Sequence, residues 1–140
     1  MTNLNEDSLT EQPAIEMFSE LGYEYKFGPD MDPDSFLPER KNYRHVILEG
    51  RLIASIRRLN PQLNESEIEE VVYQIKNVNS PNLEIANQKF YKMLSGELRI
   101  DTKKDGEKKG VFVKLIDFEN IENNVYLVVN QLPIQGPEKT

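Results

Sequence analysis

The chain of 140 residues is 38% hydrophobic and 29% charged, which is typical of a soluble globular domain with one proper core. It has no cysteine, which excludes disulfides and cysteine-ligated zinc, and its single histidine, His45, excludes any site that needs two imidazoles. No apolar run approaches the roughly 18 residues of a membrane-spanning helix. The N-terminus also lacks the basic and apolar regions of a signal peptide, so we expect a cytoplasmic protein.

The net charge of -7 is unevenly distributed along the chain. Residues 1–39 contain ten acidic side chains and one basic side chain, whereas residues 40–140 contain 16 basic and 14 acidic ones. A binding partner responds to the local field rather than to the total charge. The composition therefore argues against an indiscriminate polyanion binder and leaves local contacts with nucleic acid open.

The first third predicts a helix that turns directly into a strand. After a frayed segment at residues 1–8, Thr10 is a suitable N-cap, and apolar residues at helical spacing continue to Gly22, which ends the helix. Aromatic residues then alternate with charged ones over residues 23–27, the pattern of a short strand. Residues 28–42, with three prolines, form a long loop that is either a solvated connection or a functional segment.

Three further helices are predicted over residues 44–59, 64–78 and 80–94. The second begins with Asn64 and Glu67, which match a capping box, and the third begins with Ser80 as N-cap and Pro81 at the first helical position. Each helix has one apolar side, so we expect all three to pack on a sheet.

The remaining residues predict a meander of three strands over residues 97–135. Asp105-Gly106 is the strongest hairpin signal in the chain, and the Asn-rich break between residues 118 and 125 predicts a second hairpin. The near-continuous apolar runs 111–118 and 125–132 are typical of central, antiparallel strands. We therefore predict a single α+β domain over residues 1–140, with about four helices packed on a small, mostly antiparallel sheet.

Two groups of side chains are candidates for binding chemistry. Arg44, Arg51 and Arg58 are seven residues apart and lie within about 40° of one another on a helix, and Arg40 extends the row. Such a row suits DNA phosphates or an acidic partner, and the alternative is a solvated basic face. The carboxylates that a metal ion such as Mg²⁺ would attract are Glu11, Glu16, Asp117 and Glu119, with ordinary surface placement as the alternative. His45 fits a capping or packing role better than a base or ligand.

Four stretches together resemble one family: EQPAIEMFSELGYEY (11–25), YRHVILEGRLIASIRRLNPQL (43–63), ANQKFYKMLSGEL (86–98) and LIDFENIENNVYLVVNQLPIQG (115–136). In this order and spacing they are similar to the N-terminal region of the restriction (R) subunit of type I restriction–modification enzymes. The resemblance covers nearly the whole chain from about Leu9 onward.

The resemblance implies an ATP-dependent DNA translocase with an N-terminal nuclease domain of the PD-(D/E)XK fold. Such an enzyme cleaves duplex DNA away from its recognition site, using Mg²⁺ and ATP in a complex with methylation and specificity subunits. The family's metal-binding Asp and its Glu-x-Lys follow the segment that corresponds to residues 132–136, and neither these nor helicase motifs occur in this chain. Glu11 is the first candidate for a peripheral metal ligand and Glu16 is the second, because nucleases of this fold often contribute a carboxylate from their first helix.

Two expectations follow from this departure from the family pattern. The chain resembles the N-terminal portion of a nuclease domain, that is, a truncated restriction-endonuclease-like domain. The catalytic strands and the motor domains are absent from it, so we expect the chain to be inactive alone. The run 125–132 would then be left at a sheet edge, which we expect to pair with a second copy. The alternative function is a stand-alone protein-interaction module without catalysis, which binds a partner through the acidic N-terminal third or the open edge.

Overall fold

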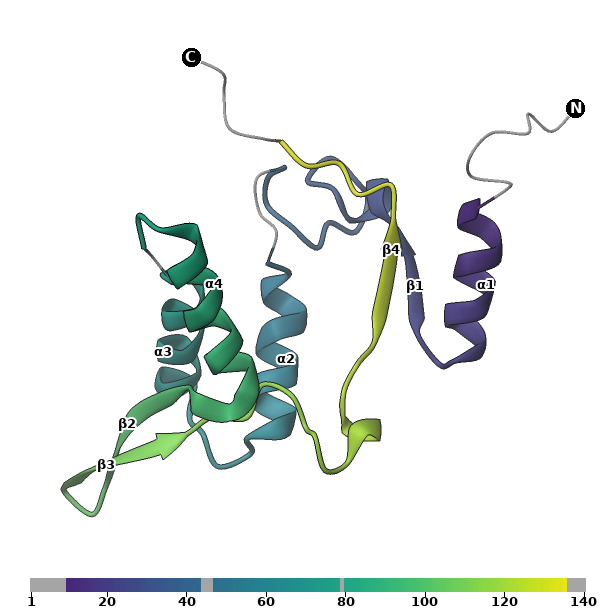
Figure 1. Ribbon diagram of the computed structural model, residues 1–140. Coiled ribbons are helices and arrows are strands. Elements are labelled where there is room, and N and C mark those ends of the chain that lie inside the picture. Colours follow the sequence, from purple (N-terminus) through teal and green to yellow (C-terminus); the bar gives the residue numbers. More distant parts are fainter. Residues whose placement is uncertain (1–9, 44–46, 79, 136–140) are drawn as a thin grey trace, which may run out of the picture. The chain divides into compact units, whose positions relative to one another are not determined.

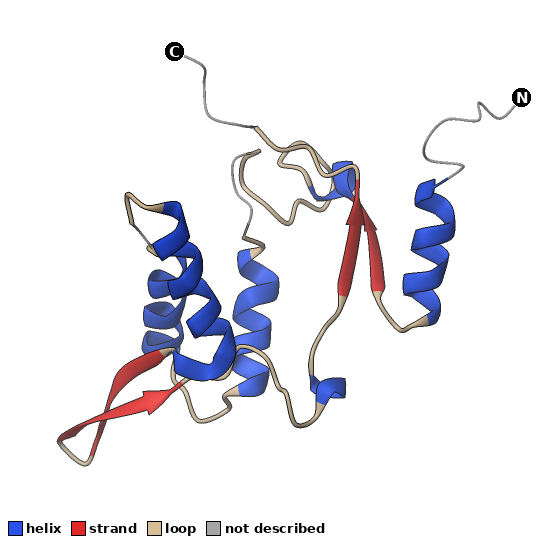
Figure 2. Cartoon of the chain, viewed as in Figure 1, coloured by secondary structure: helices blue, strands red, loops and turns tan. Residues whose placement is uncertain are grey.

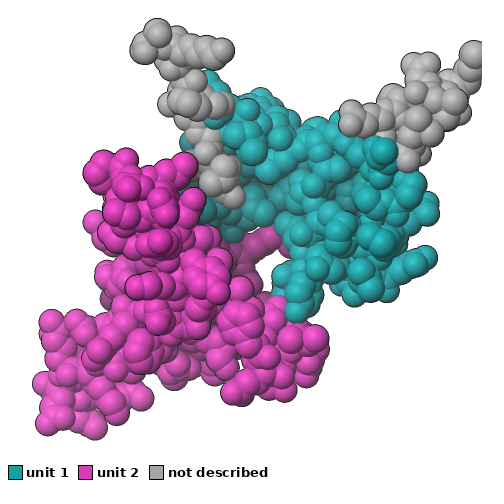
Figure 3. All heavy atoms as spheres, viewed as in Figure 1, with its two compact units in different colours: residues 1–48, 125–140 teal, residues 49–124 magenta. Residues whose placement is uncertain are grey.

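The computed structural model describes residues 10–43, 47–78 and 80–135. Its contacts divide into two compact units, one formed by residues 1–48 and 125–140 and the other by residues 49–124 (Figure 3). The described residues form four α-helices, one parallel pair of strands and one antiparallel pair (Figures 1 and 2). The predicted α+β class is confirmed. The single-domain boundary stays a prediction, and the frayed segment predicted at residues 1–8 lies outside the described residues.

The first unit begins with α1 (Gln12–Glu20), which ends as the sequence predicts. Gly22 has a φ of 93°, and the N–H of Tyr23 donates to the carbonyl of Phe18 at 3.0 Å, which is the bonding of a Schellman motif. The Phe18 and Tyr23 rings, 5.0 Å apart, supply the apolar contact that accompanies this motif. The start differs from the prediction, because the N-cap is Glu11 rather than Thr10 and its side chain makes no capping bond.

The strand that follows α1 pairs with the last strand of the chain. The strand β1 (Glu24–Phe27) lies parallel to β4 (Leu127–Asn130), with Glu24 opposite Leu127 and Phe27 opposite Asn130. In Figure 1 the two strands lie side by side although about a hundred residues separate them in the sequence. The ring of Tyr23 also packs against Tyr126, with centroids 5.2 Å apart, which fixes the start of β4 beside α1.

The predicted three-strand meander is therefore wrong. Among the described residues, the strand β3 (Glu107–Phe112) pairs only with β2 (Arg99–Lys104). Residues 113–126, which include most of the predicted strand 111–118, contain no strand. The Asn-rich break is not a hairpin turn, because its polar side chains close a loop around Asp117. Local apolarity identified β4 as a strand but contained no information about its distant partner, β1.

The proline-rich loop after β1 is not simply a solvated connection. It begins with a short 3₁₀ helix (Gly28–Met31), in which Met31 is 1% exposed. The buried Arg40 guanidinium donates to Asp32 Oδ1 from Nη2 at 2.8 Å and from Nε at 3.2 Å. Arg40 Nη2 also donates to the carbonyl of Pro133, so this buried charge is paired and fastens the loop to the chain after β4.

The second unit contains α2 (Glu49–Leu59), α3 (Glu65–Lys76) and α4 (Leu83–Lys92). The capping box is confirmed, because Asn64 Oδ1 accepts from the Glu67 N–H at 2.8 Å and Glu67 Oε1 accepts from the Asn64 N–H at 2.9 Å. The helix α3 buries the predicted apolar stripe: Ile68, Val71, Val72 and Ile75. The helix α2 starts five residues later than predicted, and residues 44–46 lie outside the described ones.

The helix α4 departs from its prediction in two ways. Its N-cap is Asn82 rather than Ser80, because Asn82 Oδ1 accepts from the N–H groups of Glu84 and Ile85. None of its residues is buried, and Leu83 is 74% exposed, so this helix does not bury its apolar side within the described residues. The helix α3, by contrast, lies against β2.

The antiparallel hairpin of β2 (Arg99–Lys104) and β3 turns at the predicted Asp-Gly pair. Asp105 and Gly106 both have positive φ, 54° and 79°, as the tight turn of a two-residue hairpin requires. Ile100 and Thr102 are buried on one face of β2. Within the described ranges, no helix combines the length and apolarity needed to cross a lipid bilayer.

Candidate functional site

The first unit gathers four polar side chains where α1 begins and β4 ends, which we call the Glu11 cluster: Glu11, Tyr25, Asn130 and Gln131. Glu11 Oε2 accepts hydrogen bonds from Asn130 Nδ2 at 3.1 Å and from Gln131 Nε2 at 3.2 Å. The Tyr25 hydroxyl donates to Asn130 Oδ1 at 2.8 Å, so Asn130 connects β1 to α1. The cluster fixes the orientation of the Glu11 carboxylate through two donors on one oxygen.

The backbone at the end of β4 is specialised to reach this cluster. Gln131 has a φ of 50°, an uncommon value for a residue with a side chain, and this bend directs the chain out of the strand. Gly28 lies beneath the bend, where a Cβ atom would stand 2.5 Å from the Gln131 carbonyl oxygen and 2.6 Å from the Leu132 Cα. Only glycine permits this approach, so Gly28 and Gln131 together set the position of the strand end.

The sequence prediction included Glu11 but missed its three partners. Asn130 and Gln131 are the first polar residues after the apolar run 125–129, and an amide pair at the end of a strand is the signal that would have found them. Glu16, the second candidate ligand, is exposed on α1 and does not join the cluster. Of the predicted carboxylates, the structure thus brings only Glu11 into a polar cluster that spans several elements of the first unit.

The cluster alone does not fit a metal ion. Mg²⁺ demands near-octahedral oxygen coordination, usually with one or two carboxylates. The described residues contain no group of three metal-ligating side chains, and the cluster itself has one carboxylate. Glu11 Oε2 is already occupied by two amide donors, which leaves Oε1 as the oxygen available to an incoming ligand.

Asp117, another predicted carboxylate, is used inside the second unit. Its Oδ1 accepts from the backbone N–H groups of Asn120 at 3.0 Å and Glu119 at 3.1 Å, and its Oδ2 accepts from Asn123 Nδ2 at 3.0 Å. These donors, the Asn120 N–H most of all, hold the pKa of Asp117 below its ordinary value against the opposing effect of burial. Asp117 is thus a loop-organising residue, with both oxygens occupied.

The predicted arginine row is only partly available for binding. Arg44 and His45 lie outside the described residues, and Arg51 is half-buried on α2. Arg58 donates from Nε to the Asn123 carbonyl at 2.9 Å and from Nη2 to Ser55 Oγ at 3.2 Å, which ties α2 to the Asp117 loop. Arg40 does not extend the row, because it is buried in the first unit against Asp32.

Comparison with known proteins gives one family. The family model described as type I restriction enzyme R protein N terminus matches residues 3–140. The chain belongs to this family. The resemblance of the four sequence stretches is confirmed, and no solved structure matches the chain.

Two curated relatives are named as endonuclease subunits of type I restriction enzymes. The chain is 41% identical, over 132 residues, to the endonuclease subunit named for the type I restriction enzyme MjaIXP of Methanocaldococcus jannaschii. It is 36% identical, over 133 residues, to the type I restriction enzyme HindI endonuclease subunit of Haemophilus influenzae. These alignments cover 94% and 95% of the chain but only 12% of each relative. The similarity therefore concerns the R-protein N-terminal segment and leaves the rest of those subunits uncompared.

Proposed function

We propose that this chain works as the N-terminal segment of the DNA-cleaving subunit of a type I restriction enzyme. The observation that carries the proposal is the family match over residues 3–140, supported by two relatives that are endonuclease subunits. Its substrate would be unmodified duplex DNA in the cytoplasm. The complete enzyme would use ATP and Mg²⁺ and would assemble with methylation and specificity subunits. Neither relative lends support to the alternative of a stand-alone interaction module.

The role proposed for the segment is to position one carboxylate rather than to complete a nuclease site. Glu11 would supply a single oxygen, Oε1, to a Mg²⁺ ion whose other ligands come from the rest of the subunit. Asn130 and Gln131 would hold the carboxylate in place by their bonds to Oε2. The ion would stabilise the charge that develops when a phosphodiester is cleaved. Because the described residues hold no complete metal site, we expect no Mg²⁺-dependent DNA cleavage by the chain alone.

The arginine row is also proposed to contact DNA phosphates. Arg44 and Arg51 would carry this contact. Arg58 is held by the Asn123 carbonyl and would serve mainly to brace the Asp117 loop. A contact of this kind would weaken as the salt concentration rises.

The test is cleavage by a restriction subunit that carries this segment. Glu11→Gln should lower the rate of DNA cleavage by at least roughly 10- to 100-fold, the loss typical even of residues that only support a metal ligand. It should also raise the Mg²⁺ concentration needed for half-maximal cleavage. The matched control is Glu20→Gln, which removes the same charge from an exposed position at the other end of α1. Wild-type cleavage and Mg²⁺ dependence in Glu11→Gln would refute the metal role, and an equal loss in both variants would show a general effect of charge.

A further inference from the structure

The β2–β3 hairpin has one buried face and one exposed face. Along β2, Ile100 and Thr102 are buried, whereas Arg99, Asp101 and Lys103 are exposed, as expected for side chains that alternate across a strand. The helix α3 lies on the buried side, where Gln74 Nε2 donates to the Arg99 carbonyl at 3.2 Å. The exposed side, which we call the outer face of the hairpin, consists of Arg99, Asp101, Lys103, Lys108, Gly110 and Phe112.

The register places two lysines side by side on this face. The Val113 N–H donates to the Leu98 carbonyl at 2.8 Å, so Leu98 and Val113 form a hydrogen-bonded pair. Alternation along an antiparallel ladder then makes Lys103 and Lys108 a non-hydrogen-bonded pair, the kind in which side chains approach each other most closely. Like charges placed directly opposite each other destabilise a sheet, so the Lys103–Lys108 pair does not help the hairpin to fold.

Few acidic side chains neutralise these cations. Lys108 makes an ion pair with Asp101 at 3.7 Å, and both side chains are well exposed, which makes the pair weak. Within the described residues, Lys103, Lys104 and Lys109 form no ion pair, whereas Arg57 on α2 is paired with Glu65 at 2.8 Å. Residues 99–112 carry five cationic and three anionic side chains in a chain whose net charge is -7.

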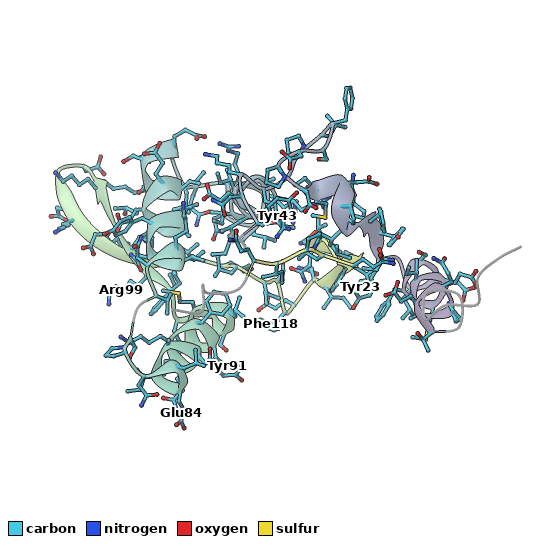
Figure 4. All side chains as sticks on the ribbon, turned by 90° about the horizontal axis from the view of Figure 1, so that it is seen from above. Tyr23, Tyr43, Glu84, Tyr91, Arg99 and Phe118 are labelled. Carbon is cyan, nitrogen blue, oxygen red and sulfur yellow. The ribbon has the colours of Figure 1, made fainter. Side chains whose placement is uncertain are left out.

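Arg99 extends the cationic surface toward the base of the hairpin. Its guanidinium lies 6.0 Å from the centroid of the Phe112 ring and close against Gly110, where a Cβ atom would collide with it. Phe112 is itself 65% exposed, so the arginine is held on an open surface rather than in a core. Arg99, which is labelled in Figure 4, is also exposed.

We propose that the outer face of the hairpin binds the phosphate backbone of duplex DNA through Arg99, Lys103 and Lys108. The inference rests on the proposed function, which makes DNA the substrate, and adds a contact that the predicted arginine row does not include. A two-stranded ribbon has strands about 4.8 Å apart and fits the major groove, which is about 12 Å wide. Arg99 and Asp101 also line a cleft with Glu67 and Glu70 of α3, so acidic side chains border the outer face at its Arg99 end, and Lys103 and Lys108 lie nearer the turn.

The experiment measures fluorescence anisotropy of a labelled duplex of random sequence, titrated with this chain at several salt concentrations. Lys103→Gln/Lys108→Gln should weaken binding by roughly tenfold and reduce the slope of log K against log salt by about 2, one for each lost phosphate contact. The control is Lys89→Gln/Lys92→Gln on α4, which removes the same charge from exposed positions outside the hairpin and should leave both quantities unchanged.

A second readout separates a binding role from a structural one. Because the double variant removes two like charges placed opposite each other, its melting temperature without DNA should be unchanged or higher, by up to about 4 °C. Equal loss of binding in both double variants, or no binding by the wild-type chain, would overturn the inference. The proposed function would survive that result, because cleavage by the subunit and its dependence on Glu11 are measured separately.

Discussion

At the scale of single residues, Asp117 shows how one carboxylate can organise a loop. Two backbone N–H groups and the Asn123 amide donate to its oxygens, and the Asn124 side chain bonds both the N–H and the carbonyl of Asp117. Every one of the donors to its carboxylate favours the ionised form, which is why the pKa of Asp117 is lowered. The loop therefore depends on a charge that acid removes.

The sign of this dependence follows from the direction of the pKa shift. A carboxyl group whose pKa is lower in the folded state stabilises the fold above about pH 4 and loses that contribution as pH falls through the folded pKa. Asp117→Asn should therefore lower the free energy of unfolding at pH 7 and flatten its decline between about pH 5 and pH 2. Urea denaturation at a series of pH values measures both effects.

The matched control for Asp117 is Asp105→Asn. It makes the same isosteric change at the exposed hairpin turn, where asparagine also accepts a positive φ. Its stability and pH dependence should match those of the wild type. If the two variants behaved alike, the lowered pKa of Asp117 would not be a source of stability.

At the scale of elements, the end of β4 depends on the absence of a side chain at Gly28. A methyl group there would meet the backbone of residues 130–132 at about 2.5 to 2.6 Å, so the strand end would have to move away from the 3₁₀ helix. We expect Gly28→Ala to lower the free energy of unfolding by about 2 to 3 kcal/mol, as overpacking does. The same displacement would separate Asn130 and Gln131 from Glu11.

The chain provides a direct comparison in Gly50, which lies in α2 with no atom within 4 Å of its missing Cβ. Gly50→Ala should raise the free energy of unfolding by roughly 0.4 to 1 kcal/mol, because alanine has less conformational entropy to lose than glycine and fits the backbone there. Urea unfolding followed by circular dichroism measures both variants. Equal stability of the two variants would contradict the close approach at Gly28.

At the scale of the whole molecule, the β1–β4 pair leaves strand edges open. Among the described residues each of these strands pairs only with the other, so one lateral edge of each carries N–H and C=O groups that no strand pairs with. Such edges pair readily with another chain. We expect the protein to self-associate, with a mass by light scattering that rises above the 16.3 kDa of one chain as its concentration increases.

A proline on the edge tests this route to self-association. The Glu24 N–H donates to the Tyr126 carbonyl at 2.8 Å, and alternation along a parallel ladder then directs the N–H of Val129 away from β1. Val129→Pro removes that outward donor and should shift the protein toward the monomer while the far-ultraviolet circular dichroism is retained. A wild-type chain that stays monomeric at every concentration would contradict the prediction.

The sequence by itself determined the features that a few neighbouring residues can produce. The Gly22 ending of α1, the Asn64–Glu67 capping box and the Asp105-Gly106 turn were all predicted, because each depends on backbone preferences and bonds within about six residues. Membership of the restriction R-protein family was also visible in the sequence, since it lies in residue order and spacing. The candidate carboxylate Glu11 was visible too, as a residue type at a helix start.

The tertiary structure alone decided which distant residues meet. Apolar patterning could not choose β1 over β3 as the partner of β4, because either pairing would bury the apolar side chains of β4. Separation along the chain could not decide it either, because the entropy lost on closing a loop grows only slowly with the length of the loop. For the same reason it could not show that Asn130 and Gln131 reach Glu11, or that Arg40 is buried while Lys103 is exposed. A residue's charge and functional group are given by the sequence, whereas its burial and its hydrogen-bond partners depend on the fold.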